Sequence, residues 1–93
     1  MPYRLVYSPE AIDDLADIKR YHAQGGRIAL RRVEHILRAA RELAEAPLRW
    51  PVDDRDPGLR MRVVEGHRIR YAVDAGRRLV YIVRVRGPWQ DLP

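Results

Sequence analysis

Arginine and apolar residues alternate along the last third of the chain, and this period-two pattern is the strongest restriction on its fold. Side chains two residues apart on a strand point to the same side. The stretches 59–64, 67–73 and 78–85 are therefore predicted to be strands. Each carries an Arg-x-Arg pair, the last of which ends one residue beyond its strand, and each pair places two guanidinium groups on one face: Arg60 and Arg62, Arg68 and Arg70, and Arg84 and Arg86.

The first turn between these strands decides whether the three pairs share a face. A two-residue turn at Glu65 and Gly66 would put Arg62 on the same face as Ile69, which would mix charge into the core. A three-residue loop, 64–66, avoids this mixture and places glycine in the left-handed third position. We therefore predict the three-residue loop.

The second turn, 74–76, also has glycine in the third position and is predicted to form the same kind of three-residue loop. In this register the six arginines line one face, with Val80 and Ile82 among them. Such a basic and apolar surface invites a partner with acidic and apolar groups. The opposite face forms the core: Leu59, Met61, Val63, Ile69, Tyr71, Val73, Leu79, Tyr81 and Val83.

The first half of the chain is predicted to form one short strand, 3–7, and two helices. Ser8 can cap the first helix and Pro9 suits its first turn, whereas Gly25 and Gly26 end it. Apolar residues at helical spacing predict the second helix over 27–45. The prediction is a single α+β domain over 1–93, in which a helical hairpin covers one face of an antiparallel sheet in the order β-α-α-β-β-β.

The formal net charge is +5, and arginine supplies all the basic residues except Lys19. This balance indicates nucleic acid or an acidic protein as a partner, although codon bias in a GC-rich genome would also raise the arginine content. The sequence has no cysteine, no apolar run long enough to span a membrane and no signal-peptide pattern. A cytoplasmic protein without membrane attachment is expected.

Few residues offer catalytic or metal-binding chemistry. The three histidines are scattered, so no metal site is expected, and no glycine motif suggests a cofactor. The arginines could hold a scissile RNA phosphate, with Glu65 or His67 as proton acceptor, or both residues could belong to an exposed hairpin end. Trp89 could be an interface anchor or could pack under the sheet.

Over nearly all its length the chain resembles the RelE/ParE superfamily of bacterial toxins from type II toxin–antitoxin systems. The resemblance rests on the strand 3–7 leading into Ser-Pro-Glu-Ala at 8–11, on the Ala-Pro end of the second helix at 46–47, and on the strings 66–74 and 80–85. It implies the fold predicted above. It also implies a hetero-oligomer with an antitoxin that wraps the toxin, and an acidic antitoxin encoded next to this chain would suit its charge.

The two branches of the superfamily differ in target. RelE-like toxins cut mRNA in the ribosome, and Arg60, Arg62 and Arg68 match basic residues of their catalytic site. ParE-like toxins poison DNA gyrase and are not known as nucleases. The RelE-like site is completed by a C-terminal arginine or histidine and a tyrosine, and the tail 87–93 has neither histidine nor tyrosine. Asp91 and Leu92 instead match ParE-like termini.

We therefore predict a ParE-like inhibitor of DNA gyrase without enzymatic activity. The alternatives are a ribosome-dependent mRNA endoribonuclease and a decayed toxin kept as an antitoxin-binding module. The residues predicted to bind the antitoxin or the target form one set: Arg60, Arg62, Arg68, Arg70, Val80, Ile82, Arg84, Arg86 and Trp89. Substitution of Arg60 or Arg68 is expected to weaken antitoxin binding in a salt-dependent way.

Overall fold

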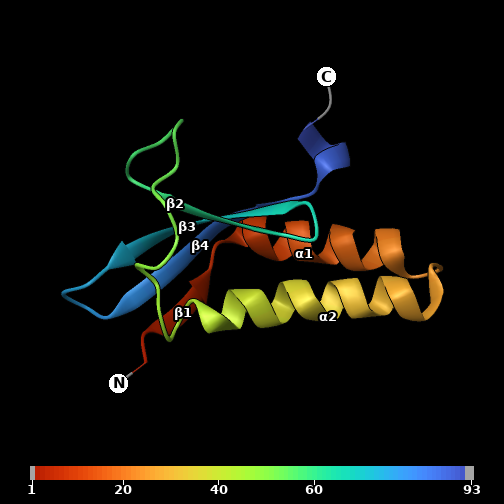
Figure 1. Cartoon of the computed structure of the whole chain (residues 1–93), viewed down its shortest axis with the longest axis horizontal. Helices are drawn as coiled ribbons and strands as arrows, with labels where there is room; N and C mark the ends of the chain where they lie inside the picture. The colour runs from red at the N-terminus through yellow and green to blue at the C-terminus, as the bar shows by residue number, and fades with distance from the viewer. Residues whose placement is uncertain (1, 92–93) are drawn as a thin grey trace.

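The computed structural model describes residues 2–91 and shows two helices on one side of a four-stranded sheet (Figure 1). The predicted α+β class and element order are confirmed. None of the helices within the described residues is long and apolar enough to cross a membrane. The elements are β1 (Arg4–Tyr7), α1 (Pro9–His22), α2 (Gly26–Glu42), β2 (Arg60–Val64), β3 (His67–Asp74), β4 (Leu79–Arg86) and a 3-10 helix, η1 (Pro88–Asp91).

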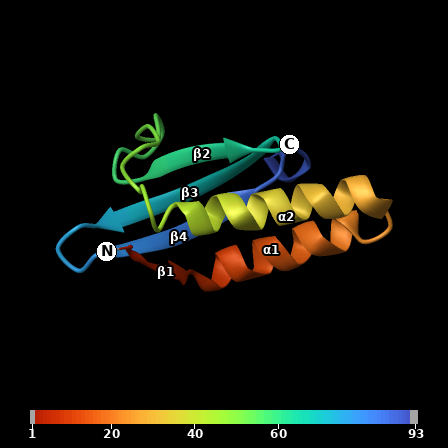
Figure 2. The same cartoon turned by 60° about the horizontal axis from the view of Figure 1, so that its bottom comes forward.

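The helical hairpin forms where the sequence predicts it. The Ser8 hydroxyl accepts a hydrogen bond from the Ala11 backbone N–H at 2.9 Å and donates one to the Val83 carbonyl at 2.7 Å, so this cap also ties α1 to β4. Pro9 occupies the first turn. After the break at Gly25, α2 runs back antiparallel beside α1, as Figure 2 shows.

The sheet has the strand order β1-β4-β3-β2 and is mixed, whereas an antiparallel sheet was predicted. β2 pairs with β3 and β3 pairs with β4 in antiparallel fashion, but β1 lies parallel to β4. The physical reason is the long crossover through both helices, which lets the first and last strands meet in the same direction. β1 therefore occupies one edge and β2 the other.

The predicted register of the β2–β3 hairpin is wrong. The turn has two residues, Glu65 and Gly66, and pairs Val64 with His67 and Arg62 with Ile69. Both turn residues have positive φ, 51° and 74°, which is typical of a type I′ turn. The twist of this turn matches that of the flanking strands, and the hairpin accepts Arg62 on the helix-facing side as a consequence.

The second hairpin also differs from the prediction. Asp74 pairs with Leu79 across the loop 75–78, and Arg78 rather than Gly76 takes the left-handed conformation. A register shift follows between Arg70 and Tyr71, so that Tyr71 pairs with Ile82 and Arg70 with Arg84. This irregularity leaves an extra residue on β4, which changes the face of the residues beyond it.

These registers exchange the two faces over the first half of β4, up to Ile82, whereas the bulge returns Arg84 and Arg86 to the predicted open face. Val80 and Ile82, predicted on the open face, have no exposed surface and lie in the core with Ile69 and Tyr71. Of the predicted core-face residues, Val63 is 59 % exposed. A shift of one residue moves every side chain of a strand to the other face, so one wrong turn length is enough to cause the error. Core residues of the helices include Ala11, Ile18, Ile36, Ala40 and, just after α2, Leu43.

Candidate functional site

Four of the six strand arginines lie on the open face of the sheet, away from the helices. Arg68 is opposite Arg86 and Arg70 is opposite Arg84, so these four side chains share a side. Arg60 and Arg62 alternate with them and lie on the helix-facing side, opposite Tyr71 and Ile69. The prediction of a six-arginine face with Val80 and Ile82 among the charges is therefore wrong. The two-residue first turn moves Arg60 and Arg62 to the helix-facing side, and the loop 75–78 of the second hairpin moves Val80 and Ile82 into the core.

Asp14 compensates two of the open-face arginines. Its side chain is 4 % exposed and accepts hydrogen bonds from Arg84 at 2.9 Å (Nε to Oδ2) and 3.0 Å (Nη2 to Oδ1). Arg86 Nη1 lies 3.6 Å from Oδ1. The Val85 backbone N–H donates to Oδ2 at 2.9 Å. Because β1 ends at Tyr7, this carboxylate satisfies the β4 edge where a neighbouring strand is no longer present.

Asp53 compensates the charge of a third open-face arginine, Arg70. Arg70 Nε donates to its Oδ2 at 2.8 Å, and the side chain of Asp53 is 4 % exposed. The hydrogen bond from the Arg55 backbone N–H is the main cause that lowers the pKa of Asp53, and the Arg70 guanidinium lowers it further. Two buried aspartates of the protein therefore compensate much of the positive charge on the open face.

Sequence reasoning missed both acids as partners of the sheet. A signal was present for Asp14, since it lies between Ala11 and Ile18 on the apolar stripe of α1, where a carboxylate requires a buried partner. No comparable pattern marks Asp53, because irregular loops have no period from which burial can be inferred.

Arg60 and Arg62 fasten the helix-to-sheet connection. Arg60 Nη1 donates to the carbonyls of Trp50 at 2.6 Å and Leu48 at 3.3 Å. Arg62 Nη1 donates to the Ala39 carbonyl at 2.9 Å and lies 3.2 Å from Glu42 Oε1. The Arg62 guanidinium also lies 4.4 Å from the centre of the Trp50 ring. These two predicted site residues are held by the C-terminal end of α2 and by the loop after it.

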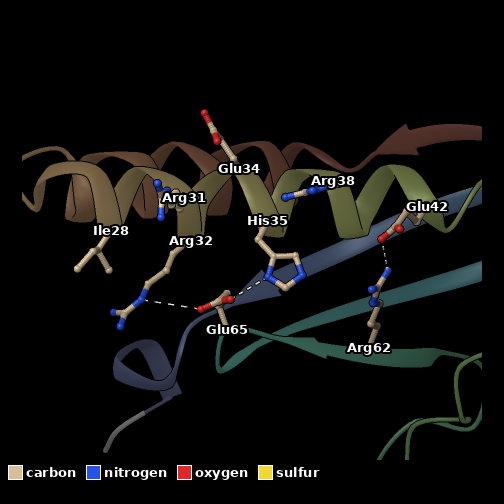
Figure 3. A pocket seen from close by; sticks show the side chains of 9 residues that line it. All are labelled: Ile28, Arg31, Arg32, Glu34, His35, Arg38, Glu42, Arg62 and Glu65. Carbon is tan, nitrogen blue, oxygen red and sulfur yellow. Dashed lines mark hydrogen bonds and ion pairs between the residues drawn. The ribbon is translucent and has the colours of Figure 1, made fainter.

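A groove of about 610 Å³ runs between α2 and the β2–β3 hairpin (Figure 3). Arg32 and His35 reach from α2 toward Glu65 in the turn, and Arg62 reaches back from β2 toward Glu42. The lining residues are Ile28, Arg31, Arg32, Glu34, His35, Arg38, Glu42, Arg62 and Glu65.

The charges of this groove are unevenly compensated. His35 Nδ1 is 2.8 Å from Glu65 Oε2, and this hydrogen bond is the main cause that lowers the pKa of Glu65. Arg32 Nε is 3.8 Å from the other carboxylate oxygen. Within residues 2–91, Arg31 and Arg38 have no hydrogen bond or ion pair, and both are exposed. The groove therefore offers two free guanidinium groups beside an exposed Ile28.

Trp89 packs between α1 and the start of β3, against the edge of the core. Its ring stacks on Tyr21 at 4.1 Å between centroids and meets His67 edge-on at 5.1 Å. The close fit extends to Gly87, where an added Cβ would lie 2.6 Å from the Trp89 ring. The structure therefore places this residue in an intramolecular aromatic cluster. Leu92 of the predicted ParE-like ending lies outside the described residues.

The proposed acid–base residues do not face the open-face arginines. Glu65 is engaged by His35 and Arg32. His67 is 2 % exposed, and its Nδ1 donates to the Glu65 carbonyl at 2.8 Å. Since successive strand residues alternate, His67 and Arg68 point to opposite sides. No group of three or more histidine, aspartate or glutamate side chains within the described part of the chain is placed to hold a metal ion.

A family model described as the ParE toxin of the type II toxin–antitoxin system parDE matches residues 5–90 of the chain. Comparison with curated protein sequences gives no significant match.

Several solved structures share the fold. A chain of the chromosomal ParDE system from P. aeruginosa superposes with a TM-score of 0.76 at 20 % identity, over 91 % of this chain and 95 % of that chain. A chain of the toxin–antitoxin complex RelBE2 from Mycobacterium tuberculosis gives 0.72 at 22 % identity, over 94 % and 99 %. A double mutant of the E. coli toxin RelE in the free state gives 0.62 at 16 % identity, over 94 % and 84 %. At these identities the likeness establishes the fold alone.

Proposed function

This chain belongs to the family of ParE toxins of type II toxin–antitoxin systems, and from that premise we propose that it inhibits DNA gyrase and is neutralised by an acidic antitoxin. The inhibition is proposed to work by binding, without a chemical step on RNA. The fold alone does not favour this target, because a RelE toxin shares it. The support comes from where the chain holds its arginines.

The observation that carries the proposal is the separation of Arg60 and Arg62 from Arg68. A phosphate-cleaving site needs its cations to converge on one scissile group. Here Arg60 and Arg62 are on the helix-facing side and are engaged by backbone carbonyls, whereas Arg68 points to the open face. The three residues that would correspond to a ribonuclease site do not converge, which favours an inhibitor that acts by binding.

A supercoiling assay with purified gyrase and relaxed plasmid tests the target directly. Addition of the toxin at micromolar concentration is expected to reduce supercoiling or to trap cleaved DNA. The matched control is the same toxin mixed beforehand with an excess of its antitoxin, which is expected to restore supercoiling. Full supercoiling activity in the presence of the folded, free toxin would reject gyrase as the target.

A measurement of mRNA cleavage distinguishes gyrase inhibition from the main alternative, an mRNA endoribonuclease. Transcripts in a translation extract are expected to remain intact when the toxin is added. Codon-phased cuts that disappear in Arg68→Ala would instead establish an endoribonuclease. Induction of the toxin in bacterial cells is expected to arrest growth, and growth at the normal rate with intact, folded protein would favour a decayed toxin that retains only antitoxin binding.

The groove beside α2 is the surface that we assign to the acidic antitoxin. Arg31 and Arg38 are free to meet carboxylates, and Ile28, which is 68 % exposed, supplies an apolar contact beside them. The open face is less suited to this role, since Asp14 and Asp53 already engage three of its arginines. Interfaces that combine free charges with exposed apolar residues gain both association rate and burial.

Charge reversal in the groove tests this assignment. The Arg31→Glu/Arg38→Glu variant is expected to bind the antitoxin at least about tenfold more weakly at low salt, with a smaller difference at high salt. Arg77→Glu, at the far tip of the β3–β4 hairpin, serves as the control with the same type of charge change. Equal losses in both variants would indicate a general effect of net charge rather than a groove contact.

A further inference from the structure

Two buried imidazole nitrogens beneath η1 lack any hydrogen-bond partner. They are Nε2 of His22, at the end of α1, and Nε2 of His67, at the start of β3. The two rings are 6.2 Å apart. Buried polar atoms almost always have a partner, so a pair of unsatisfied nitrogens in one place requires an explanation.

The two histidines lie against the ring of Trp89. Trp89 meets His67 edge-on at 5.1 Å and His22 at 6.0 Å, while its face stacks on Tyr21. This cluster packs η1 against the helical layer. A second attachment comes from Arg86, whose Nη2 donates to the Gln90 carbonyl at 2.7 Å. The position of η1 therefore depends on the charge state of the imidazoles that Trp89 covers.

We propose that His22 and His67 form an acid-sensitive latch, neutral when η1 is docked, whose protonation releases η1 and exposes Trp89. A protonated imidazole carries a hydrogen on both nitrogens, and neither Nε2 has an acceptor within reach. His67 Nδ1 already donates to the Glu65 carbonyl, so its Nε2 holds the lone pair in the neutral form. Adding a proton there would bury an uncompensated charge.

Most of the groups around His22 also disfavour its protonation. Burial is the main cause that lowers the pKa of His22, and the neighbouring His67 and Arg32 lower it further. Glu65 is the acid beside His67, but His35 and Arg32 engage its carboxylate. The other charged groups around the cluster come from α1 and β4: Asp17, Lys19, Arg20 and Arg86.

The sign of the pH effect follows from the lowered pKa of His22. Docking is fully stabilised above the ordinary histidine pKa of about 6.5 and is weakened as the pH falls below it, because the released state binds the proton more readily. If the docked form excludes protonation of His22, the opening equilibrium rises by at most about 30-fold between pH 8 and pH 5.

Trp89 provides the measurement. In a Trp50→Phe background it is the sole tryptophan, and its emission wavelength and access to acrylamide report whether η1 is docked. We expect a red shift and greater acrylamide access when the pH falls from neutral to about 5, below the ordinary histidine pKa, with far-ultraviolet circular dichroism unchanged. Gly87→Ala gives the reference for the released state at all pH values, since its Cβ would collide with the Trp89 ring.

His22→Leu in the same background is expected to remove most of the pH dependence. His35→Gln is the matched control, because its ring pairs with Glu65 on the exposed side of the turn and has no contact with Trp89 among the aromatic contacts described. Faster exchange of the Gly87, Trp89 and Gln90 amides in the wild type at acidic pH, after correction for intrinsic rates, would give independent support. An unchanged Trp89 signal in acid, or an equal response in His22→Leu, would overturn the proposal.

Discussion

The open face of the sheet and the groove beside α2 are both rich in arginine, but only the arginines of the open face meet buried aspartates. On the sheet, Arg70, Arg84 and Arg86 meet two aspartates that are almost completely buried. On α2, Arg31 and Arg38 have no such partner within the described residues. Arginines of similar appearance in the sequence therefore have different roles: the first set stabilises the fold and the second set is available to a partner.

The largest effect is expected from removing Asp14. The Asp14→Ala substitution takes the buried carboxylate away from Arg84 and Arg86 and leaves the Val85 N–H without this acceptor. We expect the free energy of unfolding to fall by about 3 kcal/mol, which is less than the full penalty for a dry ion pair because Arg84 is partly exposed. Thermal and urea melts measure the change. Asp13→Ala, on the exposed side of α1, is the control, and a loss as small as that control would contradict the role of Asp14.

Arg62 tests whether a strand arginine on the other side of the sheet is equally structural. Arg62→Met keeps much of the apolar stem but removes the hydrogen bond to Ala39 and the contact over Trp50. The expected loss is about 1–2 kcal/mol in a urea melt. Arg49→Met removes another guanidinium, 5.1 Å from the same ring but more exposed, and is expected to cost less. A larger loss of stability in Arg49→Met than in Arg62→Met would contradict the structural role of Arg62.

The contribution of Asp53 to the free energy of unfolding is expected to depend on pH. Because its folded pKa is lowered from 3.8, its contribution to stability is present above that value and is lost as the pH falls through the lower folded pKa. Asp53→Asn is therefore expected to be less stable than the wild type at neutral pH, and the two melting curves are expected to converge in strong acid. A difference that stays constant into strong acid would show that the charge of Asp53 is not responsible.

The smallest effect on stability is expected on α2. Arg31→Ala and Arg38→Ala are each expected to change the free energy of unfolding by less than about 0.5 kcal/mol, since neither side chain has a partner to lose within the described residues. Both variants should still bind the antitoxin more weakly. A stability loss comparable to that of Asp14→Ala would show that these residues belong to the folded structure, and the distinction between the two faces would no longer hold.

The local signals along the chain predicted the α+β fold well. Ser8 and Pro9 began α1, the glycine break at Gly25 separated the helices, and period-two patterning located the three C-terminal strands. The candidate site was predicted less well. The choice of turn length at Glu65 and Gly66 rested on keeping Arg62 out of the core, and the structure places Arg62 on that side with hydrogen bonds of its own.

Caps, breaks and residue periodicity act over a few neighbouring residues, so they are enough to locate the helices and strands along the chain. The face that each arginine occupies, and whether an aspartate pairs with it, depends instead on how distant segments pack together. Asp14 lies 70 residues from Arg84 in the chain, and Asp53 lies 17 from Arg70. Contacts over such separations depend on strand register and crossover geometry, and a single-residue change in a turn reverses them.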